Sequence, residues 1–165
     1  MPPLQPVTRA LLLINVAVYF LLLLLGGGIA SALALWPIGP NFLPWQVVTY
    51  AFLHGSFEHL FFNMLGLWMF GSELERVWGE KRFLQFYAAS VLAAAITQLI
   101  VTAVMGATYP TVGASGGLFG LLLAFAMMFP NRVILLFFVI PMKARYLVAL
   151  YGLLELYQGV YVMNS

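Results

Sequence analysis

The sequence predicts an all-α polytopic membrane protein with five transmembrane helices. Hydrophobic residues make up 64% of its 165 residues and charged residues 7%, and the mean hydropathy is +1.01. This composition excludes an ordinary soluble domain. A helix needs about 20 apolar residues to cross a bilayer, and charged residues, Pro and Gly divide this chain into five apolar runs. We therefore expect one transmembrane domain covering residues 1–165.

The expected spans cover about residues 10–30, 57–77, 83–105, 115–129 and 144–160. Residues 133–140 are apolar and β-branched but short, which favours an extended or re-entrant connector, although they could instead lengthen the fifth span. Arg9, the first apolar run and Ala32-Leu33-Ala34 together resemble a signal peptide. The run is long for a signal peptide, so a retained helix is the favoured interpretation.

The basic residues give the orientation of this topology. All seven fall on one side: Arg9 before the first span, then Arg76, Lys81, Arg82, Arg132, Lys143 and Arg145 in the two even-numbered connections. The positive-inside rule makes that side cytoplasmic and places the N-terminus there. The pattern is typical of a bacterial inner membrane, and organelle membranes remain an alternative. The outward segment 31–56 holds Trp36, Trp45 and Tyr50, aromatic residues that favour the headgroup region.

The remaining charges indicate neither nucleic acid nor a cofactor. The net charge is +2 and no basic patch suggests a nucleic-acid partner. The absence of cysteine excludes disulfides and thiolate ligands, and two histidines without a carboxylate at useful spacing argue against a metal site. The mixed charges of residues 73–82 are interpreted as a solvated face or an ion-pair network.

Three polar residues stand out against this apolar background. Ser115, within Gly113-Ala114-Ser115-Gly116, opens an apolar helix, while His59 and Asn63 lie near the start of another and at a similar depth. Unpaired N–H groups and the positive dipole end of a helix N-terminus favour developing negative charge. Gly113 and Gly116 allow a tight turn and close approach of a substrate. This pattern is what a nucleophile with a backbone oxyanion donor requires.

Structural interpretations of the same residues stay open on this basis alone. Ser115 could cap its helix, and Gly116 with Gly120 could form a packing face of small residues. His59 and Asn63, four residues apart on one helical face, could hydrogen-bond to a neighbouring helix, or donate to an oxyanion. His59 could also serve as a base, whereas His54 is better explained as structural.

Longer motifs carry a family resemblance. His54-Gly-Ser-Phe-Glu-His59-Leu-Phe-Phe-Asn63-Met-Leu-Gly-Leu-Trp-Met-Phe-Gly71, Glu75-Arg-Val-Trp78-Gly79 and Gly113-Ala-Ser115-Gly116 together resemble the rhomboid intramembrane serine proteases. The resemblance covers nearly the whole chain and implies a rhomboid-like helical bundle.

The resemblance also implies an activity and a site. Ser115 would be the nucleophile of a Ser–His dyad that cleaves transmembrane protein substrates within the lipid bilayer. The side chains of His59 and Asn63, with the Ser115 backbone N–H, would form the oxyanion hole. Phe119 matches a position where an aromatic ring packs against the catalytic histidine. His54, Gly113 and Gly116 complete the motifs.

One departure from the family pattern matters for activity. The family carries its general-base histidine on a sixth span, whereas both histidines of this sequence precede Ser115. We therefore expect a chain truncated before the sixth helix and inactive alone, because the Ser115 hydroxyl would have no base. The alternative is a catalytically inactive rhomboid-like protein that binds membrane helices. Neither the substrate nor the oligomeric state follows from the sequence.

Overall fold

The computed structural model describes residues 2–136 and 140–153. Its elements are α1 (Pro6–Leu25), α2 (Gly27–Leu33), α3 (Gln46–Thr49), the 3₁₀ turn η1 (Tyr50–Phe52), α4 (Phe57–Gly66), the π-helical turn η2 (Leu67–Gly71), α5 (Ser72–Trp78), α6 (Glu80–Met105), α7 (Ser115–Met128), β1 (Val133–Leu136) and β2 (Ile140–Lys143). A further helix begins at Ala144 and is described to residue 153. The chain forms two compact units, residues 1–118 and 119–165, which meet within α7 and are described separately.

The mostly helical fold agrees with the sequence prediction. Within the described residues, α1 and α6 are long and apolar enough to cross a membrane, and α7 is a shorter apolar helix. The expected second span, 57–77, corresponds to the uninterrupted run of α4, η2 and α5. The expected fifth span begins as predicted, but residues 154–160 lie outside the described residues. A topology of five spans remains a prediction.

The first span ends earlier than expected because of one glycine. We predicted residues 10–30, but α1 ends at Leu25 and the shorter α2 follows. Gly26, between them, adopts φ +91°, a backbone conformation that L side chains rarely adopt. The left-handed backbone of Gly26 therefore interrupts a run that hydropathy alone presents as continuous.

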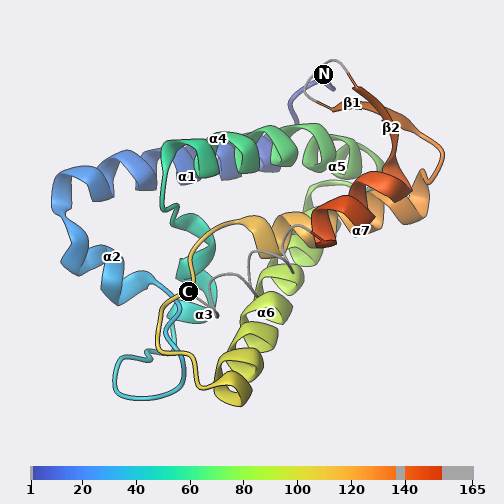
Figure 1. Cartoon of the computed structure of the whole chain (residues 1–165). Coiled ribbons are helices and arrows are strands. Elements are labelled where there is room, and N and C mark those ends of the chain that lie inside the picture. Colours follow the sequence, from blue (N-terminus) through green and yellow to red (C-terminus); the bar gives the residue numbers. More distant parts are fainter. Residues whose placement is uncertain (1, 137–139, 154–165) are drawn as a thin grey trace. The chain divides into compact units, whose positions relative to one another are not determined.

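The short apolar segment after α7 is extended, as the first interpretation of it proposed. β1 pairs antiparallel with β2 in a two-stranded sheet, with Val133 opposite Lys143 and Leu135 opposite Pro141. The two strands lie side by side in Figure 1. Residues 133–136 do not extend the following helix, which begins only after the second strand.

In the first unit, α1 runs beside α4 and α5, and α5 packs against α6 (Figure 1). The side chains at these contacts are large and apolar, and Leu67, Leu74 and Phe83 are among the most completely buried. Between helices in lipid, such contacts stabilise the packing through van der Waals attraction.

A buried carboxylate holds the N-terminus of α1. Glu75 of α5 accepts hydrogen bonds from the Val7 N–H at 2.7 Å, the Thr8 N–H at 2.8 Å and the Thr8 hydroxyl at 2.7 Å. Its side chain thereby satisfies backbone donors that the first turn of a helix leaves without intrahelical acceptors. Glu75 is only 2% exposed, so the interpretation of residues 73–82 as a solvated or ion-paired face is wrong at this position.

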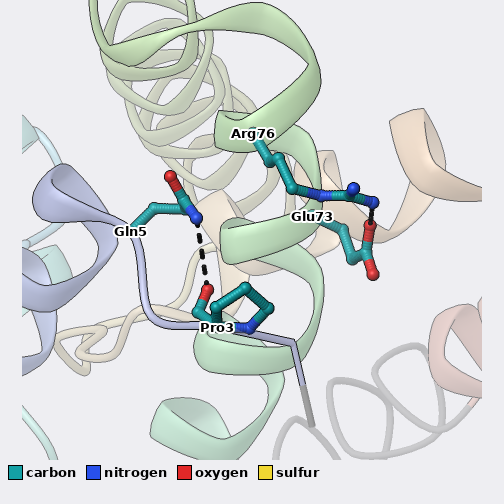
Figure 2. A network of polar contacts seen from close by, with 4 residues as sticks. All are labelled: Pro3, Gln5, Glu73 and Arg76. Carbon is teal, nitrogen blue, oxygen red and sulfur yellow. Dashed lines mark hydrogen bonds and ion pairs between the residues drawn. The ribbon is translucent and has the colours of Figure 1, made fainter.

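The neighbouring charges fit that interpretation better. Arg76 forms an ion pair with Glu73 at 2.7 Å, three residues earlier on the same helix, and the Arg76 side chain is exposed. Figure 2 shows this pair together with Gln5, whose side-chain amide donates to the Pro3 carbonyl at 3.4 Å. An exposed pair of this kind contributes little to stability.

Replacing Glu75 should destabilise the fold. Glu75→Ala leaves three donors of the α1 terminus without their acceptor, and we expect a loss of roughly 3 kcal/mol in the free energy of unfolding. Thermal unfolding in detergent, followed by circular dichroism, measures the effect. Glu80→Ala is the control, since Glu80 is exposed in the first turn of α6 and should cost no more than about 1 kcal/mol. Equal losses in both variants would contradict the capping role.

Candidate active site

Helix α4 positions His59 and Asn63. The Ser56 side chain caps the helix by accepting the His59 N–H at 3.2 Å, which satisfies one of the first-turn donors. His59 and Asn63 lie one turn apart and share a helix face. Asn63 is 5% exposed, and its Nδ2 has no hydrogen-bond partner among the described residues. A buried amide donor without a partner is costly and available to a ligand.

Ser115 is the first residue of α7. The Leu118 N–H donates to the Ala114 carbonyl at 2.9 Å, so Ala114 and not Ser115 occupies the capping position. The structure therefore does not favour Ser115 as a helix cap. Its own N–H belongs to the first turn, where N–H groups have no intrahelical acceptor. The hydroxyl and this N–H lie together at the positive end of the helix dipole.

The loop before Ser115 is anchored at two points. Leu35 and Thr111 exchange backbone hydrogen bonds of 3.0 and 2.8 Å, and the Gln98 side chain donates to the Thr111 hydroxyl at 2.9 Å. Two residues later, the Gly113 N–H donates to the Tyr50 carbonyl at 2.9 Å. These bonds connect the entry to α7 with Leu35, with Tyr50 of η1 and with Gln98 of α6.

The side chains of His59 and Ser115 both lie close to Gly113. A Cβ at Gly113 would lie 2.7 Å from Cε1 and 2.9 Å from Nε2 of the His59 ring, and 3.7 Å from Oγ of Ser115. Gly113 also has φ +124°, which L side chains rarely adopt. The missing side chain is therefore what allows the imidazole of α4 to lie against the backbone that leads into α7.

The next two glycines pack α7 against α6. A Cβ at Gly116 would lie 2.4 Å from Cβ of Ala94, and one at Gly117 would lie 2.8 Å from the ring of Tyr87 and 2.9 Å from Val91. Gly116 therefore packs closely against Ala94, whereas the expected packing face of Gly116 with Gly120 stays a prediction. The two interpretations of Gly116, packing and close approach at a site, are compatible.

His54 lies in the loop before α4 and contacts the candidate oxyanion residue. The rings of His54 and His59 meet edge to face with centroids 5.0 Å apart. Burial, and secondarily the proximity of His59, lower the pKa of His54 to about 4, although the Phe52 carbonyl acts in the opposite direction. His54 is therefore neutral at physiological pH and packs as a partly buried aromatic ring.

Phe119 lies at the start of the second unit. Its ring stacks on that of Tyr151, with centroids 5.9 Å apart and an interplanar angle of 19°. Gly152 also lies close to the Phe119 ring, since a Cβ there would be 3.5 Å from Cε2 of Phe119. The predicted role of Phe119 beside a catalytic histidine stays a prediction. No group of three or more His, Cys, Asp or Glu side chains that could hold a metal occurs among the described residues.

Tyr50 is the site residue that sequence reasoning missed. We expected it among aromatic residues at the headgroups, but it is 3% exposed and its hydroxyl donates to the Val91 carbonyl of α6 at 2.7 Å. The same hydroxyl would lie 3.4 Å from a Cβ at Gly116. Tyr50 thus lies against the residues that flank Ser115. Its carbonyl accepts from the Gly113 N–H, and its hydroxyl lies close to Gly116. Nothing in the local sequence distinguishes it from Trp45, which is half exposed.

The arrangement has the chemical parts of an acyl-transfer site. Ser115 supplies a hydroxyl at a helix N-terminus, and the imidazole of His59 and the carboxamide of Asn63 lie on the helix that contacts its entry loop. Groups of this kind stabilise an oxyanion when they are fixed before the reaction begins.

Comparison with known proteins assigns the family. The family model for the rhomboid domain matches residues 41–164, which include His59, Asn63 and Ser115. This chain belongs to the rhomboid family. The prediction made from its motifs is confirmed at that level, and rhomboid proteins are integral membrane proteins.

Relatives of this rhomboid chain come from bacteria and mitochondria. It is 39% identical over 97 residues to Rhomboid protein 1, mitochondrial, of Saccharomyces cerevisiae, covering 56% of this chain and 27% of the relative. It is 45% identical over 78 residues to Rhomboid protease GluP of Bacillus subtilis (47% and 14%) and 34% identical over 95 residues to Rhomboid protease GlpG of Klebsiella pneumoniae (56% and 34%). The chain spans less than half the length of these relatives.

Gly116 offers a direct test of the packing in this rhomboid domain. Gly116→Ala places a methyl group against Ala94 and should cost about 1–3 kcal/mol by overpacking. Adding Ala94→Gly removes the obstructing methyl and should recover most of the loss. Thermal unfolding of both single variants and the double variant in detergent measures the coupling. Gly28→Ala is the control, because nothing lies within 4 Å of that position. Strictly additive effects of the two substitutions would rule out the contact.

The pKa of His54 predicts a pH dependence of stability. The unfolded chain protonates His54 near its ordinary pKa of 6.5, whereas the folded chain does so only near pH 4. The unfolded state therefore binds more protons between these values, and stability should fall as the pH drops from about 6.5 to about 4. Melting temperatures in detergent across this range should show a shallower acid loss for His54→Gln than for the unsubstituted chain. Parallel curves would refute the assignment.

Proposed function

We propose that this chain carries the nucleophile and the oxyanion hole of an intramembrane serine endopeptidase. The family and its protease-named relatives support this activity at the level of the family. For the chain itself, the observation that carries the proposal is the contact of the His59 ring with Gly113, two residues before Ser115. A histidine, a buried unpartnered amide donor and a serine at a helix N-terminus are not needed for packing alone.

In the proposed reaction, the Ser115 hydroxyl attacks the carbonyl carbon of a peptide bond in a transmembrane protein substrate. The negative charge that develops on the carbonyl oxygen is stabilised by the Ser115 N–H and by the side chains of His59 and Asn63. The unpartnered Nδ2 of Asn63 supports this role, because an amide donor already desolvated needs little reorganisation to receive charge. Removing one such donor typically reduces kcat by about 10²–10³-fold.

The base that accepts the Ser115 proton is proposed to be a histidine outside these 165 residues, on a sixth helix. His59 is assigned to the oxyanion and His54 packs against it, so neither is the proposed base. The substrates are proposed to be transmembrane proteins, and the enzyme is proposed to lie in a bacterial inner membrane with its N-terminus in the cytoplasm. The competing proposal is a catalytically inactive rhomboid-like protein that binds membrane helices through the same fold.

Labelling of Ser115 separates the two proposals. The protein purified from its native membrane should react with a fluorophosphonate probe, because only an activated serine attacks it. Ser115→Ala should abolish both labelling and cleavage of a transmembrane substrate. Ser90→Ala is the matched control, since the Ser90 hydroxyl donates to the Phe86 carbonyl of its own apolar helix. It should label normally.

The intact mass of the same preparation should accompany this measurement. A mass above 18.3 kDa with labelling at Ser115 supports the protease and directs the search for the base to the additional residues. A correctly folded protein that shows no labelling would overturn the protease proposal and leave the helix-binding protein.

A further inference from the structure

Tyr50 joins the segment that carries Ser115 to helix α6. Its carbonyl accepts the Gly113 N–H at 2.9 Å, two residues before Ser115, and its hydroxyl donates to the Val91 carbonyl of α6 at 2.7 Å. The hydroxyl also lies close to the residue that follows Ser115, since a Cβ at Gly116 would be 3.4 Å from it. One residue therefore contacts the chain on both sides of Ser115.

The bond to Gly113 acts where the two parts of the candidate site meet. A Cβ at Gly113 would lie 2.7 Å from the His59 ring, so the position of this glycine determines how closely the ring approaches the backbone that leads to Ser115. A glycine has more backbone freedom than any other residue. A hydrogen bond from another segment is therefore needed to hold Gly113 in one conformation, and the Tyr50 carbonyl supplies it.

The hydroxyl bond of Tyr50 is additional to the hydrogen bonds of α6. Val91 lies inside this helix, where its carbonyl accepts the N–H of Ala95, four residues later. A carbonyl oxygen has two lone pairs and can accept the Tyr50 hydroxyl as well. Removing the hydroxyl thus leaves the Val91 carbonyl with an acceptor role already filled, and α6 does not depend on the bond. What the bond fixes is Tyr50 itself, which is buried.

We infer that Tyr50 is a positioning residue for the candidate oxyanion hole. By holding Gly113, it fixes the Ser115 N–H relative to the two donor side chains of α4, and it makes no contact with the substrate. The inference rests on the proposed function. Oxyanion donors stabilise charge when they are fixed in advance, and a misplacement of about 1 Å can cost about 10²-fold in rate. Loosening Tyr50 should slow the reaction of Ser115 by about tenfold.

The kinetics of labelling by a fluorophosphonate probe test the inference in the full-length protein. In this reaction the Ser115 Oγ forms a bond to phosphorus as fluoride leaves, the serine proton passes to the general base, and negative charge grows on the phosphoryl oxygen. Tyr50→Phe should lower the maximal labelling rate by about tenfold and leave the half-saturating probe concentration unchanged. The reason is that Tyr50 aligns donors for the developing charge and does not bind the probe.

Thr102→Val is the matched control. The Thr102 hydroxyl is buried and donates to the Leu99 carbonyl of α6 at 3.1 Å, so this variant also removes a buried hydroxyl bond to that helix. It lies about three helical turns beyond Val91 and should change both labelling parameters by less than about twofold. Equal changes in the two variants would overturn the inference, as would a change in the half-saturating concentration alone.

A His59→Ala background tests whether Tyr50 acts through the oxyanion hole. Tyr50→Phe should slow labelling less in this background than in the unsubstituted protein, because one of the donors that Tyr50 aligns is already missing. A residue with a merely structural role would slow labelling equally in both backgrounds. Equal slowing would therefore overturn the assignment.

The outcomes separate the inference from the proposed function. A folded, unsubstituted protein that is not labelled overturns the proposed function and the inference with it, whereas labelling that Tyr50→Phe leaves unchanged overturns the inference alone. Melting temperatures in detergent verify folding of each variant.

Hydrogen exchange of the unsubstituted protein provides a second test if Tyr50→Phe does not fold. Relative to its intrinsic rate, the Gly113 amide should exchange more slowly than the Ser115 amide, because only the former donates to the Tyr50 carbonyl. Equal protection of the two amides would overturn the inference.

Discussion

The candidate site depends on the close approach of backbone and side chain at three glycines around the start of α7. The His59 ring packs against Gly113, Ala94 against Gly116 and Tyr87 against Gly117. In each case the neighbour lies so close that a Cβ on the glycine would clash with it. Helices in lipid gain little from hydrophobic burial against one another, so van der Waals contact at such small residues is a principal source of their association. Here the same contacts also set the position of Ser115.

Much of the fold could be predicted, because lipid imposes strong constraints on composition and length. The helical runs 57–77, 83–105 and 115–129 were located from apolar stretches bounded by charged residues, Pro and Gly, and they differ from the observed helices by at most a few residues. The end of α1 could not be located in this way, since Gly26 is one of three consecutive glycines and only its backbone conformation shows which one interrupts the helix. The extended segment after α7 was expected. Its pairing with Ile140–Lys143 could not be predicted, because the hydropathy of residues 133–140 does not determine the register of a strand pair.

The site was less predictable than the fold. Ser115, His59 and Asn63 are polar residues in apolar runs, and this contrast alone identifies them as candidates. Tyr50 in the site and Glu75 at the terminus of α1 gave no such signal, because the sequence suggested an interfacial aromatic residue at position 50 and a surface charge at position 75. Both act through contacts with segments distant in sequence: Tyr50 with Val91 and Gly113, and Glu75 with Val7 and Thr8. Long-range contacts of this kind follow from the packing of helices and not from a local pattern.

The π-helical turn Leu67–Gly71 lies between the part of the helix that carries His59 and Asn63 and the part that carries Glu75. A π turn holds one residue more than an α turn, and one additional residue rotates everything beyond it by about 100° around the helix axis. The part before Leu67–Gly71 presents His59 and Asn63, while the part after it presents Glu75 to the terminus of α1. The π turn therefore changes the direction in which Glu75 points relative to the candidate site residues His59 and Asn63. Deleting a single residue in this turn would leave the composition almost unaltered and still turn one of these two faces away from its neighbours.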